Sequence, residues 1–324
     1  MSDPSRSSQA VEVGLSAAIV SVCDGEPRIL VAPRAGRERE GLPVGPFDPL
    51  RHRTFEISLR AFVGEQTGLP LGYVEQLYTF GDRGRHRADA DRALQVVSVG
   101  YLALTRTEAG ENEAIAATGS AWQPFYRYLP WEDWRQGRPD FIDGTILPAL
   151  RSHRPSPTSG ISRQMSWETR LTLAFGEDGA GWDEERALDR YEMLYEAGLV
   201  EEAVRDGRAG AAPAEPFGIA MRLDHRRILA TAIARLRAKL KYRPVIFELL
   251  PAEFTLTDLQ RAAEAIAGRH VHKQNFRRFV ETTGLVEPTG GIASATGGRP
   301  AALFRFRPEV TRERPSPGIR FGRA

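Results

Sequence analysis

The last third of the chain shows a fixed succession of short segments, and this order constrains the fold more than any other feature. Residues 224–242 form a basic amphipathic stretch that predicts a helix, and Pro244 stops it. The apolar line of this helix, at four-residue spacing, consists of Ile228, Ala232, Leu236 and Leu240. We expect its basic residues to face away from that line; they are Arg226, Arg227, Arg235, Lys239 and Lys241.

Two further helices and two strands follow. The stretch "TLTDLQRAAEAIAG" predicts a helix with a capping box of Thr257 and Gln260 and an end at Gly268. Residues 272–283 predict a shorter, basic helix, after which strands near Leu285 and over 303–306 enclose a glycine-rich loop. Helix, turn, helix and two-stranded wing is the order of a winged helix-turn-helix domain, a unit that binds DNA.

The side chains of the short basic helix divide into two faces. The packing face has the spacing i, i+3, i+4 and i+7 and consists of Phe276, Phe279, Val280 and Thr283. The other face turns outward near the end of the helix that enters the major groove, where Arg reads guanine and Gln or Asn reads adenine. The candidate DNA contacts are His272, Lys273, Gln274, Asn275, Arg277, Arg278 and, at the tip of the wing, Arg299. For Asn275 a local cap or turn hydrogen bond is the alternative.

Two histidines near this helix form an H-x-H pair, His270 and His272. Metal sites of this kind need a further cysteine, histidine or carboxylate. Because we expect no acidic side chain or cysteine near the pair, phosphate contact or plain solvation is favoured over a metal site.

Charge is distributed unevenly along the chain. From Arg222 to Arg307 there are 16 Lys or Arg against 7 Asp or Glu, whereas the remainder holds 28 against 35. Within that remainder, residues 151–221 are acidic, with 8 basic against 13 acidic residues. A basic module joined to an acidic remainder indicates contact with a polyanion. A solvated basic surface is the alternative.

Composition narrows the class of protein further. The 324 residues suffice for two or three domains, and no apolar run approaches the roughly 18 residues of a membrane span. The opening "MSDPSRSSQA" has no apolar signal core, and the single Cys23 excludes an internal disulfide framework. These features predict a cytoplasmic protein with no membrane partner.

The first 150 residues alternate strand-like and helical stretches. "VGLSAAIVSV" and "PRILVAP" predict two strands joined by the turn "DGEP", and "ALQVVSVGYLAL" predicts a long strand. Between them, "RTFEISLRAFVGEQTGL" predicts a helix that ends at Gly68. The order of strand, "LPVG" loop, helix ending "GEQTGL" and strand resembles the Nudix hydrolase fold.

The resemblance does not extend to the catalytic box of that family, which clusters glutamates around Mg²⁺. Alignment on residues 67–69 places Ala61 at the arginine of the box, Phe62 and Arg53 at two glutamates, and Glu65 alone at a matching glutamate. One carboxylate cannot hold Mg²⁺ against a diphosphate. We therefore expect no catalytic residues, no metal and no cofactor.

Four stretches together resemble the Nudix-related transcriptional regulators of NAD metabolism. They are "VEQLYTFGDRGR…QVVSVGYLAL", "DHRRILATAIARLRAKLKYRPVIFELLP", "FTLTDLQRAAEAI" and "NFRRF…GLVEPTG…GRPAALFRF". The resemblance implies a homodimer on operator DNA and an NAD-related nucleotide effector such as ADP-ribose. The additional residues 151–221 are more similar to the longer, alphaproteobacterial repressors of NAD synthesis, and this difference leaves the identity of the effector open.

The expected architecture is α+β. It comprises a tail (1–10), a Nudix-like α/β/α sandwich with a mixed sheet (11–150), a helical acidic insert with linkers (151–221), a linker helix with the winged helix-turn-helix domain (222–310), and a second tail (311–324). The candidate effector contacts are Arg34, Glu65, Arg83, Arg85, Arg87 and Arg92. Cations at the mouth of a pocket suit a phosphate-bearing ligand.

Repression of NAD biosynthesis genes from a palindromic operator is the function that the resemblance implies. Two alternatives stay open at this point. One is a Nudix-type pyrophosphatase acting on ADP-ribose or NADH, and the other is a C-terminal module that binds protein instead of DNA.

Overall fold

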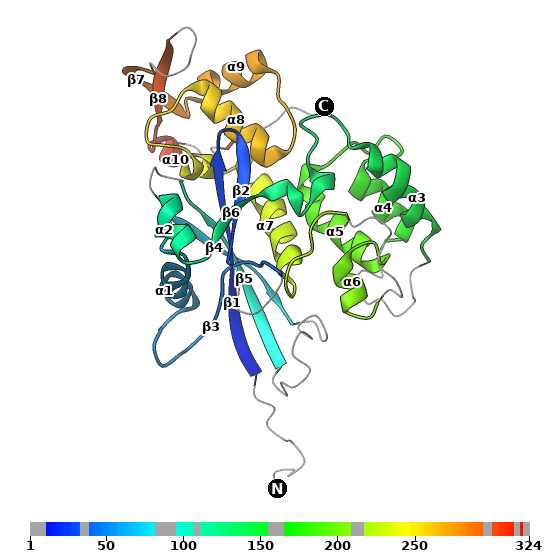
Figure 1. Cartoon of the computed structure of the whole chain (residues 1–324). Helices are drawn as coiled ribbons and strands as arrows, with labels where there is room; N and C mark the ends of the chain where they lie inside the picture. The colour runs from blue at the N-terminus through cyan, green and yellow to red at the C-terminus, as the bar shows by residue number, and fades with distance from the viewer. Residues whose placement is uncertain are drawn as a thin grey trace.

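The computed structural model describes residues 11–32, 39–81, 95–106, 111–154, 165–208, 217–293, 300–313 and 318–319. Within these residues a mixed sheet forms the centre of the molecule, and the helices α1 and α2 lie on one side of it (Figure 1). The other side is covered by α7 and, beyond it, by the helices α3 to α6. The helices α8 and α9 with the strands β7 and β8 lie at the end remote from the N-terminus.

The sheet contains strands β1 (Val11–Cys23), β2 (Glu26–Val31), β3 (Val44–Pro46), β4 (Tyr73–Phe80), β5 (Gln95–Leu104) and β6 (Ala121–Pro124). Their order is β4-β5-β1-β2-β6, with β3 also paired to β1. Strand β1 runs parallel to β5, and the other pairings are antiparallel. The mixed sheet is as predicted. The β1–β2 turn is the tight one expected from "DG", with positive φ angles at Asp24 (53°) and Gly25 (77°).

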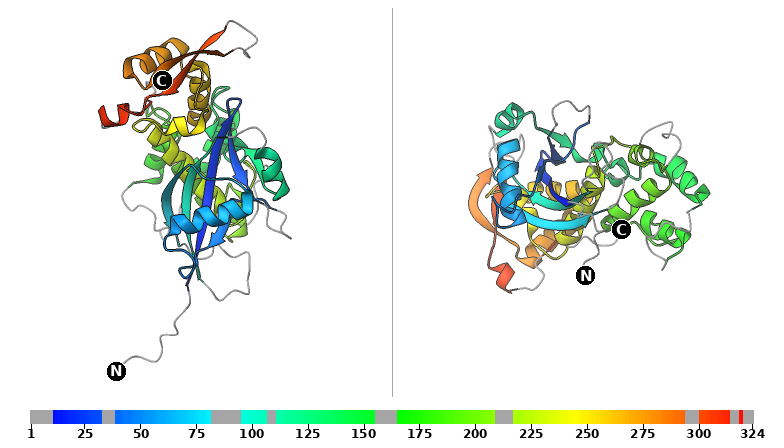
Figure 2. Two further views of the ribbon diagram at one scale, coloured as in Figure 1. Left: turned by 90° about the vertical axis from the view of Figure 1, so that its left-hand side faces the viewer. Right: turned by 90° about the horizontal axis from the view of Figure 1, so that it is seen from below.

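The two faces of the sheet follow the alternation of side chains along β1. Leu15, Ala17 and Ile19 face the helix α1 (Phe55–Thr67), where Leu59 and Val63 are buried against them. The alternate residues of β1, including Ala18 and Val20, point to the opposite face and belong to the cluster around α7 (His225–Leu240). Figure 2 shows α1 lying across its face of the sheet. The second side of the sandwich is therefore covered by α7, which begins about 100 residues after β6, the last strand of the sheet.

Helix α1 ends where the sequence predicts, and a threonine caps its start. The Thr54 hydroxyl accepts a hydrogen bond from the backbone N–H of Ile57 at 3.2 Å, and Gly68 takes the left-handed conformation at the other end (φ 72°). The short helix α2 (Glu111–Ala117) places Ile115 in the same apolar cluster. Single helical turns at Phe125–Arg127, Pro130–Glu132 and Ile142–Ile146 then lead from β6 into α3 (Leu147–Ser152).

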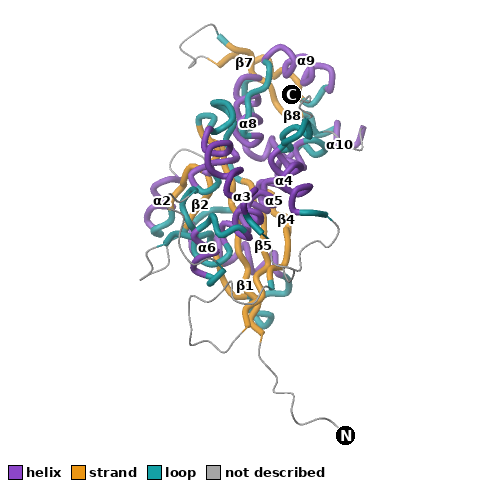
Figure 3. Tube along the Cα trace, turned by 90° about the vertical axis from the view of Figure 1, so that its right-hand side faces the viewer, coloured by secondary structure: helices purple, strands orange, loops and turns teal. Residues whose placement is uncertain are grey.

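The insert is helical, as predicted, and packs against α7. It contains α4 (Trp167–Phe175), a helical turn at Glu184–Arg186, α5 (Ala187–Glu196) and α6 (Glu201–Arg205). Figure 3 views the molecule from the side of these helices. Tyr191 and Tyr195 are buried, and Gly198 (φ 74°) separates α5 from α6.

The basic residues of α7, expected to face away from its apolar line, are not all at the surface. Arg226 and Arg227 are almost fully buried, where Arg226 forms an ion pair with Glu202 and Arg227 with Glu192. Both carboxylates come from the insert. The acidic insert therefore neutralises part of the basic segment inside the protein, because a charge buried without a counterion costs several kcal/mol. That share of the positive charge is not available to a polyanion.

A second buried ion cluster connects the insert, α7 and α8 (Leu256–Ala267) through Glu132. Its carboxylate accepts two hydrogen bonds from Arg190, at 2.6 and 2.8 Å, and one from Arg237, and all three side chains are buried. Arg237 Nε also donates to the carbonyl of Ile266 at 2.9 Å, near the end of α8. Burial alone would raise the pKa of Glu132, but the guanidinium groups of Arg190 and Arg237 outweigh it and hold that pKa below its ordinary value.

The C-terminal module has the predicted winged helix order. After a helical turn at Val245–Leu249 come α8, α9 (Lys273–Thr283), β7 (Val286–Ala293), β8 (Ala301–Phe306) and the short α10 (Val310–Glu313). The backbones of Phe254 and Phe304 exchange hydrogen bonds of 3.0 and 2.8 Å, so the residue before the cap of α8 extends the wing by a bridge. One hydrophobic cluster continues from the sheet through α7 into α8 and α9.

Candidate nucleic-acid interface and effector domain

The two faces of α9 are those that the sequence predicts. Phe276 and Val280 are buried, and Phe279 is half-buried against the same cluster. The exposed residues around the N-terminal half of the helix are His272, Lys273, Gln274, Asn275, Arg277 and Arg278. No side chain caps the N-terminus of α9 at His272. The first backbone N–H groups of this helix are therefore open to an anion.

The turn that holds α9 against α8 is built around Glu264. Its carboxylate accepts the backbone N–H of Val271 at 3.0 Å and the side-chain amide of Gln260 at 2.9 Å, and it lies 2.9 Å from Nδ1 of His270. Burial raises the pKa of Glu264, but these hydrogen bonds outweigh it and lower that pKa. The expectation that His270 has no acidic neighbour was wrong, since the end of α8 brings Glu264 to it.

The start of α8 differs from the predicted capping box. The cap of α8 is Thr255, whose hydroxyl accepts the N–H of Asp258 at 3.1 Å, and whose own N–H donates to the Asp258 carboxylate at 3.0 Å. The cap lies two residues before Thr257, because Leu256 is the first residue of the helix. Gln260 instead positions the turn through Glu264 and the carbonyl of Val271, a role that only its four-residue spacing to Glu264 could have indicated.

The cations of α9 differ from those of the wing in their partners. Within the described part of the chain, Lys273, Arg277 and Arg278 form no ion pair, whereas Arg305 lies 2.7 Å from Glu287 and Arg307 pairs with Glu313. Unpaired exposed guanidinium and ammonium groups on one helix face create a positive surface for phosphate and base edges. The wing candidate, Arg299, lies outside the described residues.

The candidate effector contacts can be placed only in part. Arg34, Arg83, Arg85, Arg87 and Arg92 lie outside the described residues. Glu65, the one candidate among the described residues, is exposed near the end of α1.

A magnesium ion of the Nudix type does not fit the residues of α1. Its two carboxylates, Glu56 and Glu65, are nine residues apart, which separates them by about 14 Å along the helix axis. Glu56 is also held in an ion pair with Arg60 at 2.9 Å. Phe62, at a glutamate position of the Nudix box, packs against the apolar cluster of this face. Among the described residues no group of three or more His, Cys, Asp or Glu could hold a metal ion.

Comparisons with known proteins agree with both parts of this structure. The profile of the NrtR DNA-binding winged helix domain matches residues 246–306. A curated relative, the ADPR responsive transcriptional repressor NtrR of Acinetobacter baylyi, is 43% identical over 83 residues, which are 26% of this chain and 33% of the relative. The matched segment thus spans only a third of that protein. No helix in the described ranges is long and apolar enough to cross a bilayer.

Two solved structures extend the likeness over the whole fold. The crystal structure of Shewanella oneidensis NrtR complexed with a 27mer DNA has a TM-score of 0.54 at 20% identity, covering 96% of this chain and 98% of that one. A MutT/nudix family protein from Enterococcus faecalis has a TM-score of 0.52 at 15% identity, covering 95% and 90%. The chain therefore joins a Nudix-like domain to an NrtR DNA-binding winged helix domain, the organisation of the Nudix-related transcriptional regulators that its sequence resembles.

Proposed function

We propose that the chain is a transcriptional repressor of NAD biosynthesis genes that binds operator DNA through α9 and responds to a nucleotide effector. The observation that carries this proposal is the division of α9, whose aromatic face is buried while its basic face is exposed and without ion pairs. The A. baylyi relative, which carries the matched segment, is named as an ADPR responsive repressor. ADP-ribose is accordingly the first effector to test.

Each exposed residue of α9 has a role that its chemistry suits. Arg277 and Arg278 carry the bidentate donors that recognise guanine, and Gln274 and Asn275 can pair with adenine. Lys273 and His272 lie at the open N-terminus of the helix, where they and the backbone N–H groups suit a phosphate. Asn275 makes no capping hydrogen bond within the described residues, which favours the DNA contact over the local one.

A homodimer would present two copies of α9 to successive major grooves, about 34–36 Å apart on a palindromic operator. An effector acts on such a repressor only if it binds the DNA-competent and the DNA-incompetent arrangement with different affinity. These features, like a cytoplasmic location, are part of the proposal.

The Nudix-like domain of this repressor is proposed to bind its nucleotide without hydrolysing it. The fold that it shares with a MutT/nudix protein is the one observation in favour of a pyrophosphatase. Against it stand the separation of Glu56 from Glu65 and the packing of Phe62. Release of AMP from ADP-ribose or NADH with Mg²⁺ or Mn²⁺, lost in Glu65→Gln, would establish the enzyme instead.

The test is binding of the full chain to fluorescent duplexes from upstream regions of NAD-synthesis genes, measured by anisotropy at several salt concentrations. Arg277→Ala is expected to reduce discrimination between these and scrambled duplexes. Arg312→Ala, an exposed cation on α10, serves as the matched control and should leave it unchanged. Absence of duplex binding, together with salt-insensitive association with a protein partner, would contradict the proposal.

A further inference from the structure

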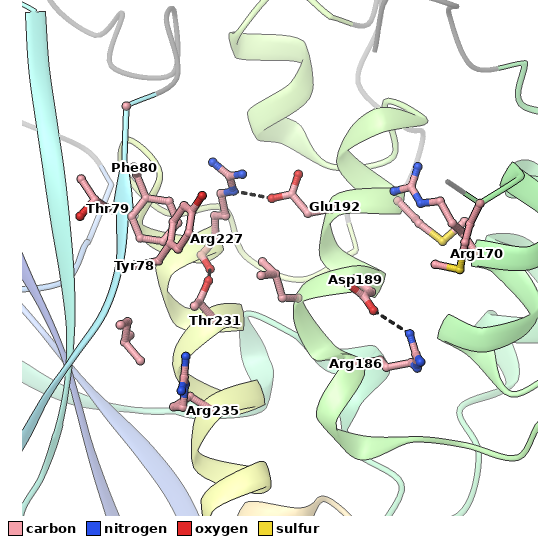
Figure 4. Close-up of a pocket in the computed structure, with 15 residues that line it drawn as sticks. Tyr78, Thr79, Phe80, Arg170, Arg186, Asp189, Glu192, Arg227, Thr231 and Arg235 are labelled. Carbon is pink, nitrogen blue, oxygen red and sulfur yellow. Dashed lines mark hydrogen bonds and ion pairs between the residues drawn. The ribbon is translucent and has the colours of Figure 1, made fainter. Parts of the chain in front are cut away.

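A cavity of about 790 Å³ lies between the edge strand β4 and the helical insert. Figure 4 shows its walls: Tyr78, Thr79 and Phe80 on one side, α7 behind them, and α5 opposite. Small-molecule sites typically have volumes of about 300–1,000 Å³. The cavity is distinct from the outer face of α1, where a Nudix hydrolase would bind metal, because α1 and α7 cover opposite faces of the sheet.

One part of the cavity is aromatic and apolar. The rings of Tyr78 and Phe80 meet edge to face with their centroids 5.5 Å apart, and α5 contributes Leu188 and Met193. Tyr78 is 63% exposed and Met165 is 43% exposed, although both are large apolar side chains. Two such side chains from different parts of the chain, left uncovered at one cavity, form a surface on which a planar ring can stack.

The other part of the cavity is cationic. Its lining includes four arginines against two carboxylates, Asp189 and Glu192. The four arginines, which come from α4, the turn before α5, and α7, are Arg170, Arg186, Arg227 and Arg235. Three of them are held by carboxylates of the insert: Arg227 by Glu192, Arg170 by Glu196, and Arg186 by Asp183 and Asp189. An arginine has five N–H donors, so the loosely paired Arg235 keeps the most donors for a phosphate. Arg235 is the most accessible, with its side chain 47% exposed and 4.0 Å from Glu75.

We propose that this cavity is the effector site and that it takes a nucleotide, with the base against Tyr78 and the phosphates toward the arginines. This inference rests on the proposed function, since it locates the effector of the repressor. It also assigns a role to the insert, which supplies the wall opposite the sheet. A nucleotide suits the site because it combines a planar ring with anionic oxygens, and the cavity presents partners for both.

The position of the cavity connects it to the DNA-binding module. Arg227, Thr231 and Arg235 line it from α7, and on the same helix Arg237 donates to the carbonyl of Ile266 in α8. A nucleotide that draws β4 and α5 together therefore acts on the helix that carries α8 and, through the Glu264 turn, α9. The effect on DNA binding equals the difference in nucleotide affinity between the two arrangements.

The experiment is isothermal titration of the full chain with ADP-ribose and with ATP, in parallel with duplex binding. Tyr78→Ala and Arg235→Glu are each expected to weaken nucleotide binding about tenfold or more, through lost stacking and reversed charge. Both side chains are largely exposed, so the thermal unfolding midpoint should stay close to that of the wild type. Duplex binding without nucleotide should persist in both variants, but the nucleotide should no longer alter it at wild-type concentrations.

Two controls separate this inference from the proposed function. Glu113→Gln changes an exposed carboxylate of α2, on the opposite side of the sheet, and should leave nucleotide affinity unchanged. Arg277→Ala should weaken duplex binding while nucleotide binding persists. Wild-type nucleotide affinity in both Tyr78→Ala and Arg235→Glu would overturn the inference and leave the repressor proposal intact. So would a wild-type chain that binds the duplexes but neither nucleotide. A chain that binds nucleotide through the cavity and no duplex would contradict the proposed function alone.

Discussion

Glu132 offers the sharpest test of how the parts of this molecule are held together. Replacement of Glu132 by Gln keeps the size of the side chain but removes the only carboxylate that pairs with Arg190 and Arg237 in the described structure. Both guanidinium groups are at most 1% exposed, so neither can recover hydration without local unfolding. Breaking a buried ion pair in this way costs about 3–5 kcal/mol.

The matched control is Glu287→Gln, which removes the exposed ion pair with Arg305 at 2.7 Å. A surface pair of this kind contributes about 0–1 kcal/mol. Chemical denaturation of the full chain, followed by tryptophan fluorescence, should therefore show a difference of about 2–5 kcal/mol between the two variants. Equal destabilisation by Glu132→Gln and Glu287→Gln would refute the interpretation of the buried cluster.

The pH dependence of the stability difference between wild type and Glu132→Gln provides a second measurement. The pKa of Glu132 is lower in the folded protein than its ordinary value. The ionised Glu132 therefore stabilises the fold fully at any pH above the pKa that this side chain has in the unfolded chain. That effect is lost as pH falls through the lowered, folded-state pKa. The stability difference between wild type and Glu132→Gln should consequently be greatest near neutral pH and shrink in acid. A difference that grows in acid would contradict the assigned direction.

The remaining predictions concern the C-terminal module. Arg277→Ala should weaken specific duplex binding by about 1–3 kcal/mol, measured by anisotropy, and an unchanged footprint would argue against base contact. Thr255→Ala should destabilise the chain by about 1 kcal/mol in chemical denaturation, whereas Thr257→Ala should have little effect. A larger loss in Thr257→Ala would show that Thr257 is the cap of α8. Phe276→Ala should cost about 3–5 kcal/mol because the ring is buried, and wild-type stability of that variant would show that α9 packs differently.

Local patterns predicted the elements of this fold well where a single helix or strand decides its own bounds. The glycine at position 68, the alternation in β1 and the aromatic spacing in α9 each depend on neighbours in the sequence, and each has the expected structure. The predicted cap of α8 was wrong because both Thr255 and Thr257 have a polar residue three positions later. Only the start of the helix distinguishes them.

Features that depend on distant contacts were not accessible from the sequence. In the sequence, Arg226 and Arg227 look like residues of a solvated helix face. Only the packing of α5 and α6 against α7 shows that both are buried in ion pairs with Glu202 and Glu192. The cavity beside Tyr78 is likewise made by segments about 90 to 160 residues apart in the chain. Periodicity within one helix carries no information about either.

The pairing of α7 with the insert also limits how a chain of this type can change during evolution. Deletion of the insert alone would strand two arginines in an interior without their carboxylates, and substitution of those arginines alone would strand the carboxylates. Gain or loss of residues 151–221 must therefore be accompanied by replacements at Arg226 and Arg227 or by new carboxylates beside them. A shorter homologue of this chain should carry uncharged residues at those two positions, or a new acidic partner elsewhere.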